Sequence, residues 1–298
     1  MRLRRRTPLE FCRGRRAAAV ALGCLRALEA LAAQLPEDAP WQPLFNGRDL
    51  SGWLPKVRGY APGENFGRTF RVEDGLLKVS YSQYEDFAER FGHIFYTTPY
   101  SHYRLRLEYR FVGEQAPNAP EWALRNSGVM LHSQPPETMH DGQDFPISIE
   151  VQFLGGLRDG EPRPTGNVCT PGTHIVFAGE FTDTHCIDAA APTFYGDQWV
   201  RSETLVLGAQ RFVHFINGEP VIEYGGITTG GGVVSDYDPA LKPEGRPLDS
   251  GYIALQSEGH PVHFRRIELL NLKGCMDPAA SNFRPHFVEP HRPACLYE

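Results

Sequence analysis

Residues 103–111 read YRLRLEYRF and alternate apolar with charged side chains. Successive side chains of a β-strand point to opposite faces, so this stretch predicts a strand with one buried and one wet face. Residues 147–154, ISIEVQFL, alternate in the same way. The turn signals Glu73-Asp74-Gly75 and Asn217-Gly218 lie between apolar runs and predict two hairpins.

The strand pattern continues towards the C-terminus. Residues 252–256 and 262–269 are further predicted strands, and no long stripe with a 3.6-residue period appears after residue 40. These features predict an all-β fold, an antiparallel β-sandwich or jelly roll. The Gly- and Pro-rich span from Gly225 to Arg246 is predicted to be one long loop near a functional edge.

The composition excludes several classes of protein. Hydrophobic residues make up 41% and charged residues 22% of the 298-residue chain, which excludes a disordered or collagen-like protein. The formal net charge is −6, so the chain lacks the overall positive field that holds a nucleic-acid backbone. We therefore predict no nucleic-acid partner.

The N-terminal segment is basic and then apolar. Seven arginines lie within residues 1–16, and the apolar run 17–25 follows them. This order is typical of a secretory signal, which we place in residues 1–33, and the run is too short for a membrane-spanning helix. Ala30-Leu31-Ala32 resembles a cleavage site and Ala21-Leu22-Gly23-Cys24 a lipoprotein box, while an amphipathic helix is the alternative. We expect an exported protein, periplasmic, extracellular or lipid-anchored at the cell envelope, without a transmembrane segment.

Four of the six cysteines lie outside this segment, in two closely spaced pairs. The spacing predicts the disulfides Cys169–Cys186 and Cys275–Cys295, as expected of a protein outside the cytoplasm. A metal site formed by Cys169, His174, His185 and Cys186 is the alternative. Structural zinc sites usually have more tightly spaced cysteines, so the disulfide is favoured.

An ordered set of motifs spans residues 41–272. It begins with LFNGRDLSGW at 44–53 and VEDGLL at 72–77. The later motifs are NSGV at 126–129, EVQ at 150–152, TGN at 165–167, GDQW at 196–199, NGE at 217–219, LQSEG at 255–259 and FRRI at 264–267. The set resembles the domain of unknown function 1080 family, described as 3-keto-disaccharide hydrolases or 3-keto-glucoside 1,2-lyase/hydratases.

The resemblance implies a concanavalin-like β-sandwich that acts on carbohydrate. Its expected substrate is a 3-keto-glycoside, which is cleaved by β-elimination and hydrated to give net hydrolysis, with a separate sugar 3-oxidoreductase as a functional partner. Two positions depart from the family pattern: many members have Arg where His132 stands, and Asp-His where Ser257-Glu258 stand. Residues 274–283, GCMDPAASNF, resemble a short C-terminal motif of exported bacterial proteins, so residues 273–298 are predicted to be a Cys-stapled tail.

Elimination next to a ketone needs a base near C2, a positive group or metal at the enolate oxygen, and an acid for the leaving group. Glu150, on the polar face of the strand 147–154, is our first candidate for the base or a metal ligand; a solvated strand carboxylate is the alternative. His132, Glu258 and His260 are the other candidate catalytic residues. These four side chains also suit a divalent cation, and their spacing does not distinguish the two possibilities.

Several further residues are expected to bind the sugar. Amide and guanidinium groups would contact hydroxyl groups and aromatic rings would stack on the sugar ring, which gives Arg125, Asn126, Gln152, Gln256, Trp122 and Tyr195. The remaining histidines His140, His174, His185 and His214 are expected at the surface or in packing. Because a sandwich also hosts non-catalytic carbohydrate-binding modules, that function is the alternative to an enzyme.

Overall fold

The computed structural model describes residues 39–157 and 159–297. The chain from Trp41 to Glu298 forms one compact unit. The expected signal segment, residues 1–33, lies outside the described residues. Among the described residues, no helix has the length and apolar character needed to cross a bilayer.

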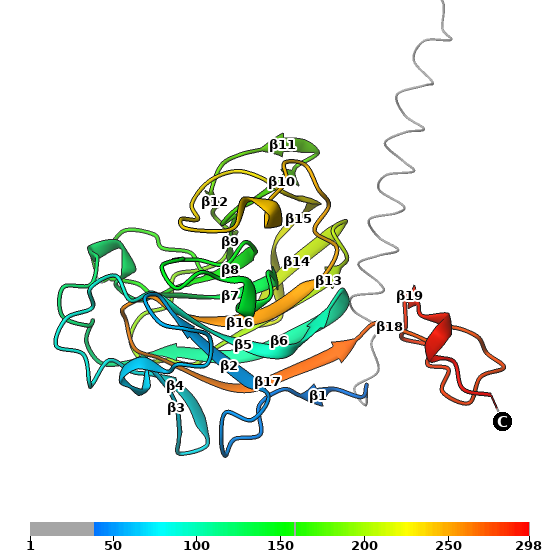
Figure 1. Ribbon diagram of the computed structural model, residues 1–298, viewed down its shortest axis with the longest axis horizontal. Helices are drawn as coiled ribbons and strands as arrows, with labels where there is room; N and C mark the ends of the chain where they lie inside the picture. The colour runs from blue at the N-terminus through cyan, green and yellow to red at the C-terminus, as the bar shows by residue number, and fades with distance from the viewer. Residues whose placement is uncertain (1–38, 158, 298) are drawn as a thin grey trace, which may run out of the picture. The chain divides into compact units, whose positions relative to one another are not determined.

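Two antiparallel sheets form the fold (Figure 1). The larger sheet has the order β11 (Glu180–Thr182), β10 (Thr173–Phe177), β15 (Glu219–Thr229), β14 (Arg211–Ile216), β13 (Val200–Leu207), β6 (His102–Phe111), β17 (Val262–Asn271), β4 (Leu76–Val79) and β3 (Phe70–Glu73), and β1 (Gln42–Pro43) pairs with β17. The smaller sheet has the order β12 (Cys186–Ile187), β9 (Asn167–Cys169), β8 (Ile149–Leu154), β7 (Asn126–Ser133), β16 (Gly251–Ser257), β5 (Gly92–Tyr100) and β2 (Trp53–Val57). The predicted all-β sandwich is confirmed.

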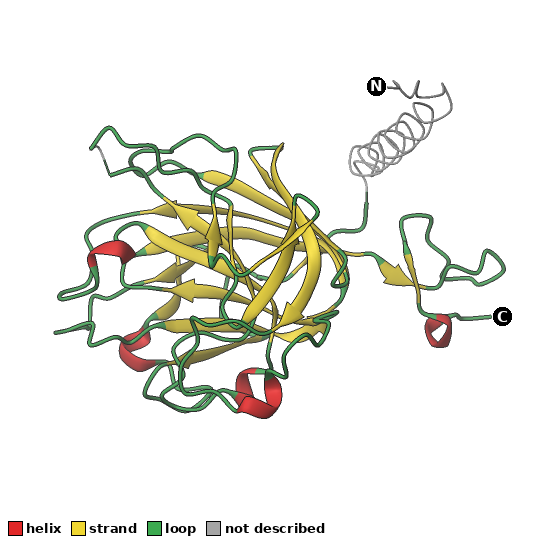
Figure 2. Ribbon diagram, turned by 90° about the horizontal axis from the view of Figure 1, so that it is seen from above, coloured by secondary structure: helices red, strands yellow, loops and turns green. Residues whose placement is uncertain are grey.

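Helices are confined to short 3-10 turns in the part of the chain that the structure describes (Figure 2). They are η1 (Phe66–Arg68), η2 (Glu121–Ala123), η3 (Pro136–Thr138), η4 (Pro239–Leu241) and η5 (Arg292–Ala294). The sheets therefore supply the core, and the turns and loops at their edges supply the surroundings of any site.

The alternating strand at 103–111 lies in the middle of the larger sheet, as β6. Its apolar residues are at most 3% exposed, and its charged residues are half-buried on the other face. Tyr109 stacks on Phe153 of β8 with ring centroids 4.1 Å apart, which brings the inner faces of the two sheets into direct contact. The side-chain period of two thus fixes which face of each sheet enters the core.

The loop predicted from Gly225 is shorter than expected, because β15 continues through it to Thr229. Gly225 and Gly226 are strand residues here. A Cβ at Gly225 would lie 1.9 Å from the backbone oxygen of Gln210, so glycine permits a close approach of two backbones rather than a turn. The loop proper covers residues 230–246, interrupted by η4.

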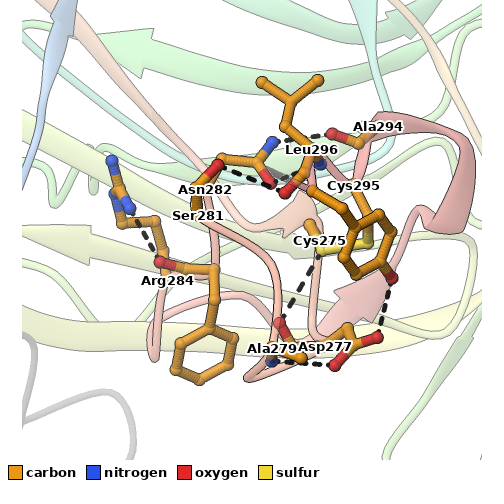
Figure 3. Close-up of a disulfide and its surroundings, with 11 residues drawn as sticks. Cys275, Asp277, Ala279, Ser281, Asn282, Arg284, Ala294, Cys295 and Leu296 are labelled. Atoms are coloured by element: carbon orange, nitrogen blue, oxygen red, sulfur yellow. Dashed lines mark hydrogen bonds between the residues drawn. A yellow bond between two sulfur atoms is a disulfide. The ribbon is translucent and has the colours of Figure 1, made fainter.

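The C-terminal tail is held by a disulfide and by local hydrogen bonds (Figure 3). Cys275 bonds to Cys295, the Tyr297 hydroxyl donates to Asp277 at 2.7 Å, and the Asn282 amide donates to the Ala294 carbonyl oxygen at 2.6 Å. Two short parallel strands, β18 (Lys273–Gly274) at its start and β19 (Glu289–Pro290) before η5, pair within this segment. Such a short piece depends on its disulfide because it buries little apolar surface.

The second disulfide, Cys169–Cys186, joins β9 to β12 at the edge of the smaller sheet. It closes a loop with a sequence separation of 17 residues, which constrains the unfolded chain. We expect the double substitution Cys169→Ala and Cys186→Ala to lower the free energy of unfolding by about 3 kcal/mol, measured by urea denaturation at neutral pH. An unchanged urea midpoint would contradict this prediction. The control is the double substitution Cys275→Ala and Cys295→Ala, which removes the disulfide of the C-terminal tail, outside the sandwich.

Candidate active site

The candidate site lies on the face of the smaller sheet that points away from the main core. The apolar residues of β8 belong to that core, so Glu150 and Gln152 point to the opposite face. The neighbouring strand β7 makes room for the acid. A Cβ at Gly128 would lie 2.7 Å from Glu150 Oε1, so the glycine of the NSGV motif is the residue that accommodates this carboxylate.

A cavity of about 290 Å³ lies on this face. It is lined by Trp122, Asn126, Phe145, Glu150, Gln152, Cys169, Pro171, His185, Cys186, Val233 and Glu258. Five of the residues predicted from the sequence thus meet in one place: Trp122, Asn126, Glu150, Gln152 and Glu258. Glu150 is only 5% exposed, because residues from six segments that connect strands also line the cavity.

Two buried carboxylates face this cavity. Glu150 is the second residue of β8, and Glu258 follows directly after β16. Both are at most 5% exposed. Glu150 Oε1 and Glu258 Oε2 have no hydrogen-bond partner among the described residues. Buried carboxylates without a compensating partner are rare in a merely structural role, because they lose hydration and gain nothing in return.

The protonation of the pair follows from its surroundings. Burial raises the pKa of Glu150 to about 8. Burial raises the pKa of Glu258 well above its ordinary value, the Glu150 charge raises it further, and Arg163 opposes the shift. Because the charge on Glu150 raises the pKa of Glu258, the pair titrates in two steps. Between these steps the site offers one carboxylate as a base and one carboxylic acid as a proton donor.

Polar groups continue along the same face towards β5. Gln256 lies opposite His93 across the strand pair, and both side chains are fully buried. Neither the Gln256 amide nor the His93 imidazole has a hydrogen-bond partner among the described residues. Burial, together with the nearby Lys56, lowers the pKa of His93 to about 3, so the ring is neutral. His93 is absent from our sequence prediction, although the alternation in GHIFY (92–96) signals it.

Aromatic side chains form one wall of the site. Trp122, on η2, stacks on Phe91 with ring centroids 5.7 Å apart and planes inclined by 18°. Phe91 in turn contacts Phe145 at 5.2 Å. Trp122 is nevertheless 53% exposed and lines the cavity, and its stacking on a sugar ring stays a prediction.

His132 does not join these residues. Two residues of β7, Leu131 and His132, stand against the single Ile253 of β16, which makes a β-bulge, and His132 has a φ of +48°. The bulge reverses the side-chain alternation, so the ring enters the core between the sheets, against Tyr103 and Phe212. Simple alternation from Gly128 would have placed His132 on the cavity face, and this is why the sequence-based expectation fails for it.

His260, Arg125 and Tyr195 lie outside the cavity lining. His260 packs against Phe111 with ring centroids 5.7 Å apart, and burial together with Arg125 and Arg163 lowers its pKa to about 4. The Arg125 guanidinium donates to the Gly196 carbonyl oxygen and lies 3.9 Å from Asp197. Tyr195 is 41% exposed. These residues surround the end of the sheet next to Glu258 but do not contact the cavity.

The predicted disulfide forms a further part of the wall. Within the described residues, the one compact group of potential metal-binding side chains is Cys169, His185 and Cys186, whose ligand atoms lie within 4.8 Å of one another. The two sulfurs are bonded to each other, so they are not thiolate ligands. The predicted disulfide is therefore confirmed, and the alternative metal site is not formed by these cysteines. His174 lies apart, 3.0 Å from Glu244.

Comparison with known proteins gives one family. Residues 40–270 match the 3-keto-alpha-glucoside-1,2-lyase-like domain. No curated protein sequence matches the chain. Two solved structures of candidate glycosyl hydrolases from Parabacteroides distasonis ATCC 8503 resemble it. The first has 19% sequence identity and a TM-score of 0.47, and the match covers 78% of this chain and 99% of that chain. The second has 18% sequence identity and a TM-score of 0.45, and the match covers 80% of this chain and 98% of that chain. A Bacillus subtilis protein with a galectin-like fold has 14% identity and a TM-score of 0.40 over 78% of this chain and 94% of that chain.

The family match begins just before β1 and ends within β17, so it includes both sheets and both carboxylates. The chain therefore belongs to the 3-keto-alpha-glucoside-1,2-lyase-like family.

Proposed function

We propose that this protein cleaves 3-keto-glycosides by β-elimination across C1 and C2 and then hydrates the product, which gives net hydrolysis. The observation that carries the proposal is the pair formed by Glu150 and Glu258. Two buried carboxylates face one cavity, burial raises the pKa of both, and the charge on Glu150 raises that of Glu258 further, so we assign the base to Glu150 and the acid to Glu258.

The chemistry assigns one proton transfer to each residue. The ketone at C3 acidifies the C2 proton, which the Glu150 carboxylate removes to give an enolate. The enolate re-forms the ketone with a double bond between C1 and C2, and the C1–oxygen bond breaks. Glu258 gives its proton to the departing oxygen. Water then adds its oxygen to C1 and a proton returns to C2, so the products are a 3-keto-sugar and an alcohol.

The remaining polar groups suit the sugar. Asn126 and Gln152 line the same cavity, and the Asn126 side-chain oxygen has no partner among the described residues. Gln256 lies on the same face of the sheet. We propose that these three amides bind and orient the sugar hydroxyl groups, because positioning the C2 proton over Glu150 reduces the entropy cost of the transfer.

The alternative to a base and an acid without a metal is a divalent cation that binds both carboxylates. The oxygen atoms of Glu150, Glu258 and Asn126 are the donor type that Mg²⁺ or Mn²⁺ prefers, so the residues present fit such an ion. When bound, the cation would supply a positive charge to stabilise the enolate oxygen. The chain's own contribution, positioning the sugar and moving the C2 proton, is the same in both cases.

We also propose that the protein acts outside the cytoplasm. Two disulfides support this, since such bonds persist in oxidising compartments. The substrate has to be oxidised at C3 before it arrives. A separate oxidoreductase that removes two electrons and two protons from the C3 hydroxyl is therefore the expected partner in the reaction sequence.

The test is an assay with the purified protein and methyl 3-keto-glucoside of each anomer, followed by NMR, with methyl glucoside as the control. We expect release of methanol from a 3-keto compound and none from the parent glucoside. Turnover that survives EDTA favours the base and acid without a metal, and turnover that EDTA abolishes and Mg²⁺ or Mn²⁺ restores favours the cation. Binding measured by calorimetry without turnover in any condition would replace the enzyme by a carbohydrate-binding module.

A further inference from the structure

Two chemically different groups of residues line the cavity. One group consists of the carboxylates and amides described above. The other consists of Trp122, Phe145, Pro171, Val233 and the disulfide, together with His185. Apart from the Trp122 indole N–H, His185 supplies the only side-chain hydrogen-bonding group of this second group within the described residues. We call this second group the apolar wall.

Trp122 is the largest part of the apolar wall. Phe91 covers one face of the indole in a nearly parallel stack, and more than half of the side chain stays exposed. The free face of the ring is therefore held in a fixed orientation at the cavity. A flat apolar group can stack on it without first having to order the side chain.

Val233 stands on the loop 230–246 and has an unusual backbone conformation. Its φ is +57°, which a β-branched residue rarely adopts, and its side chain is 50% exposed. The exposed side chain is therefore available to a ligand in the cavity that it lines.

Hydrogen bonds hold Val233 and Phe145 together. The backbone N–H and the hydroxyl of Ser235 donate to the Asp144 carboxylate at 2.8 and 2.7 Å, and the Gly172 N–H donates to the Gly232 carbonyl oxygen at 2.8 Å. The two apolar side chains therefore belong to one preformed surface, although they are far apart in the sequence.

We infer that the apolar wall is the binding site for the leaving group, and that the preferred substrates are 3-keto-glycosides of flat apolar alcohols. The inference rests on the proposed function, which places the sugar ring at the carboxylates. A second sugar at the apolar wall would leave most of its hydroxyl groups without hydrogen-bond partners, and that loss disfavours a disaccharide. His185, whose Nδ1 has no partner among the described residues, suits one oxygen on an aromatic ring.

The test compares leaving groups of similar chemical reactivity on the full chain. Benzyl alcohol and a sugar alcohol are both poor leaving groups, so benzyl 3-keto-glucoside is compared with 3-keto-cellobiose for the β anomer and with 3-keto-maltose for the α anomer. We expect kcat/KM to favour the benzyl compound by about tenfold or more. Methyl 3-keto-glucoside, which barely reaches the apolar wall, measures the basal activity.

Two variants make the test specific. Trp122→Ala should lower kcat/KM for the benzyl compound about tenfold more than it lowers kcat/KM for the methyl compound. Phe181→Ala, at an exposed aromatic residue that packs on His174 outside the cavity, is the matched control and should change neither.

The outcomes separate the two proposals. The inference is overturned, and the proposed function stands, if methyl 3-keto-glucoside is turned over and the disaccharides are used as well as or better than the benzyl compound. An equal effect of Trp122→Ala on the methyl and benzyl compounds has the same consequence. Inertness of all the 3-keto compounds overturns the proposed function and the inference with it.

Discussion

Glu150→Gln lowers the turnover of methyl 3-keto-glucoside by about 10²–10⁴-fold. The amide keeps the size of the side chain and its place beside Gly128, but it cannot accept the C2 proton. The measurement is steady-state kcat on purified protein whose circular dichroism spectrum matches that of the wild type. Glu268→Gln is the matched control, because Glu268 pairs with Arg106 on the larger sheet, away from the cavity, and should leave turnover unchanged.

The same variant should be more stable than the wild type at alkaline pH. The folded-state pKa of Glu150 is raised from 4.5 to about 8, so its contribution to stability is fully present below pH 4.5 and is lost as the pH rises through 8. The amide that replaces the carboxylate does not titrate, and the difference in the free energy of unfolding between the variant and the wild type amounts to on the order of 5 kcal/mol above pH 8.

A folded Glu150→Gln variant with near-full turnover would reduce Glu150 to a structural residue and leave Glu258 and His260 as the groups to examine.

Alternation along single strands was sufficient to predict the fold and part of the site. The pattern of 103–111 correctly placed one strand face in the core, and the pattern of 147–154 correctly placed Glu150 on the other. Both predictions rest on a local rule, because a strand with one apolar face has only one way to bury it. Asn126 followed from its place in the NSGV motif, and Trp122 from its aromatic ring.

The rest of the site depends on geometry that a strand pattern does not contain. The bulge at Leu131 and His132 adds one residue to β7 and turns His132 into the core. The contact between Asp144 and Ser235 joins segments 91 residues apart and brings Val233 over the cavity. A long-range hydrogen bond of this kind leaves no periodic signal in the sequence, so the cover of the cavity was not predictable.

The pH dependence of the reaction gives the second large effect. We expect kcat/KM for methyl 3-keto-glucoside to rise about tenfold per pH unit up to about pH 8, because the fraction of Glu150 in the basic form rises in this way. At higher pH the rate falls as Glu258 loses the proton that the leaving group needs. The measurement is a rate profile from pH 5.5 to 10, with the spontaneous elimination at each pH subtracted.

The variant Glu258→Gln separates the two limbs of this profile. In this assignment Glu150 ionises while Glu258 is neutral, and burial is the cause that raises the pKa of Glu150. The acidic limb should therefore stay near pH 8 in Glu258→Gln, at a kcat lowered by about 10²-fold or more, and the alkaline limb should disappear. A cation shared by the carboxylates would keep both ionised near neutral pH, and the acidic limb of the wild type would then lie well below pH 8. A wild-type profile that is flat between pH 6 and 9 would exclude Glu150 as a base with a raised pKa.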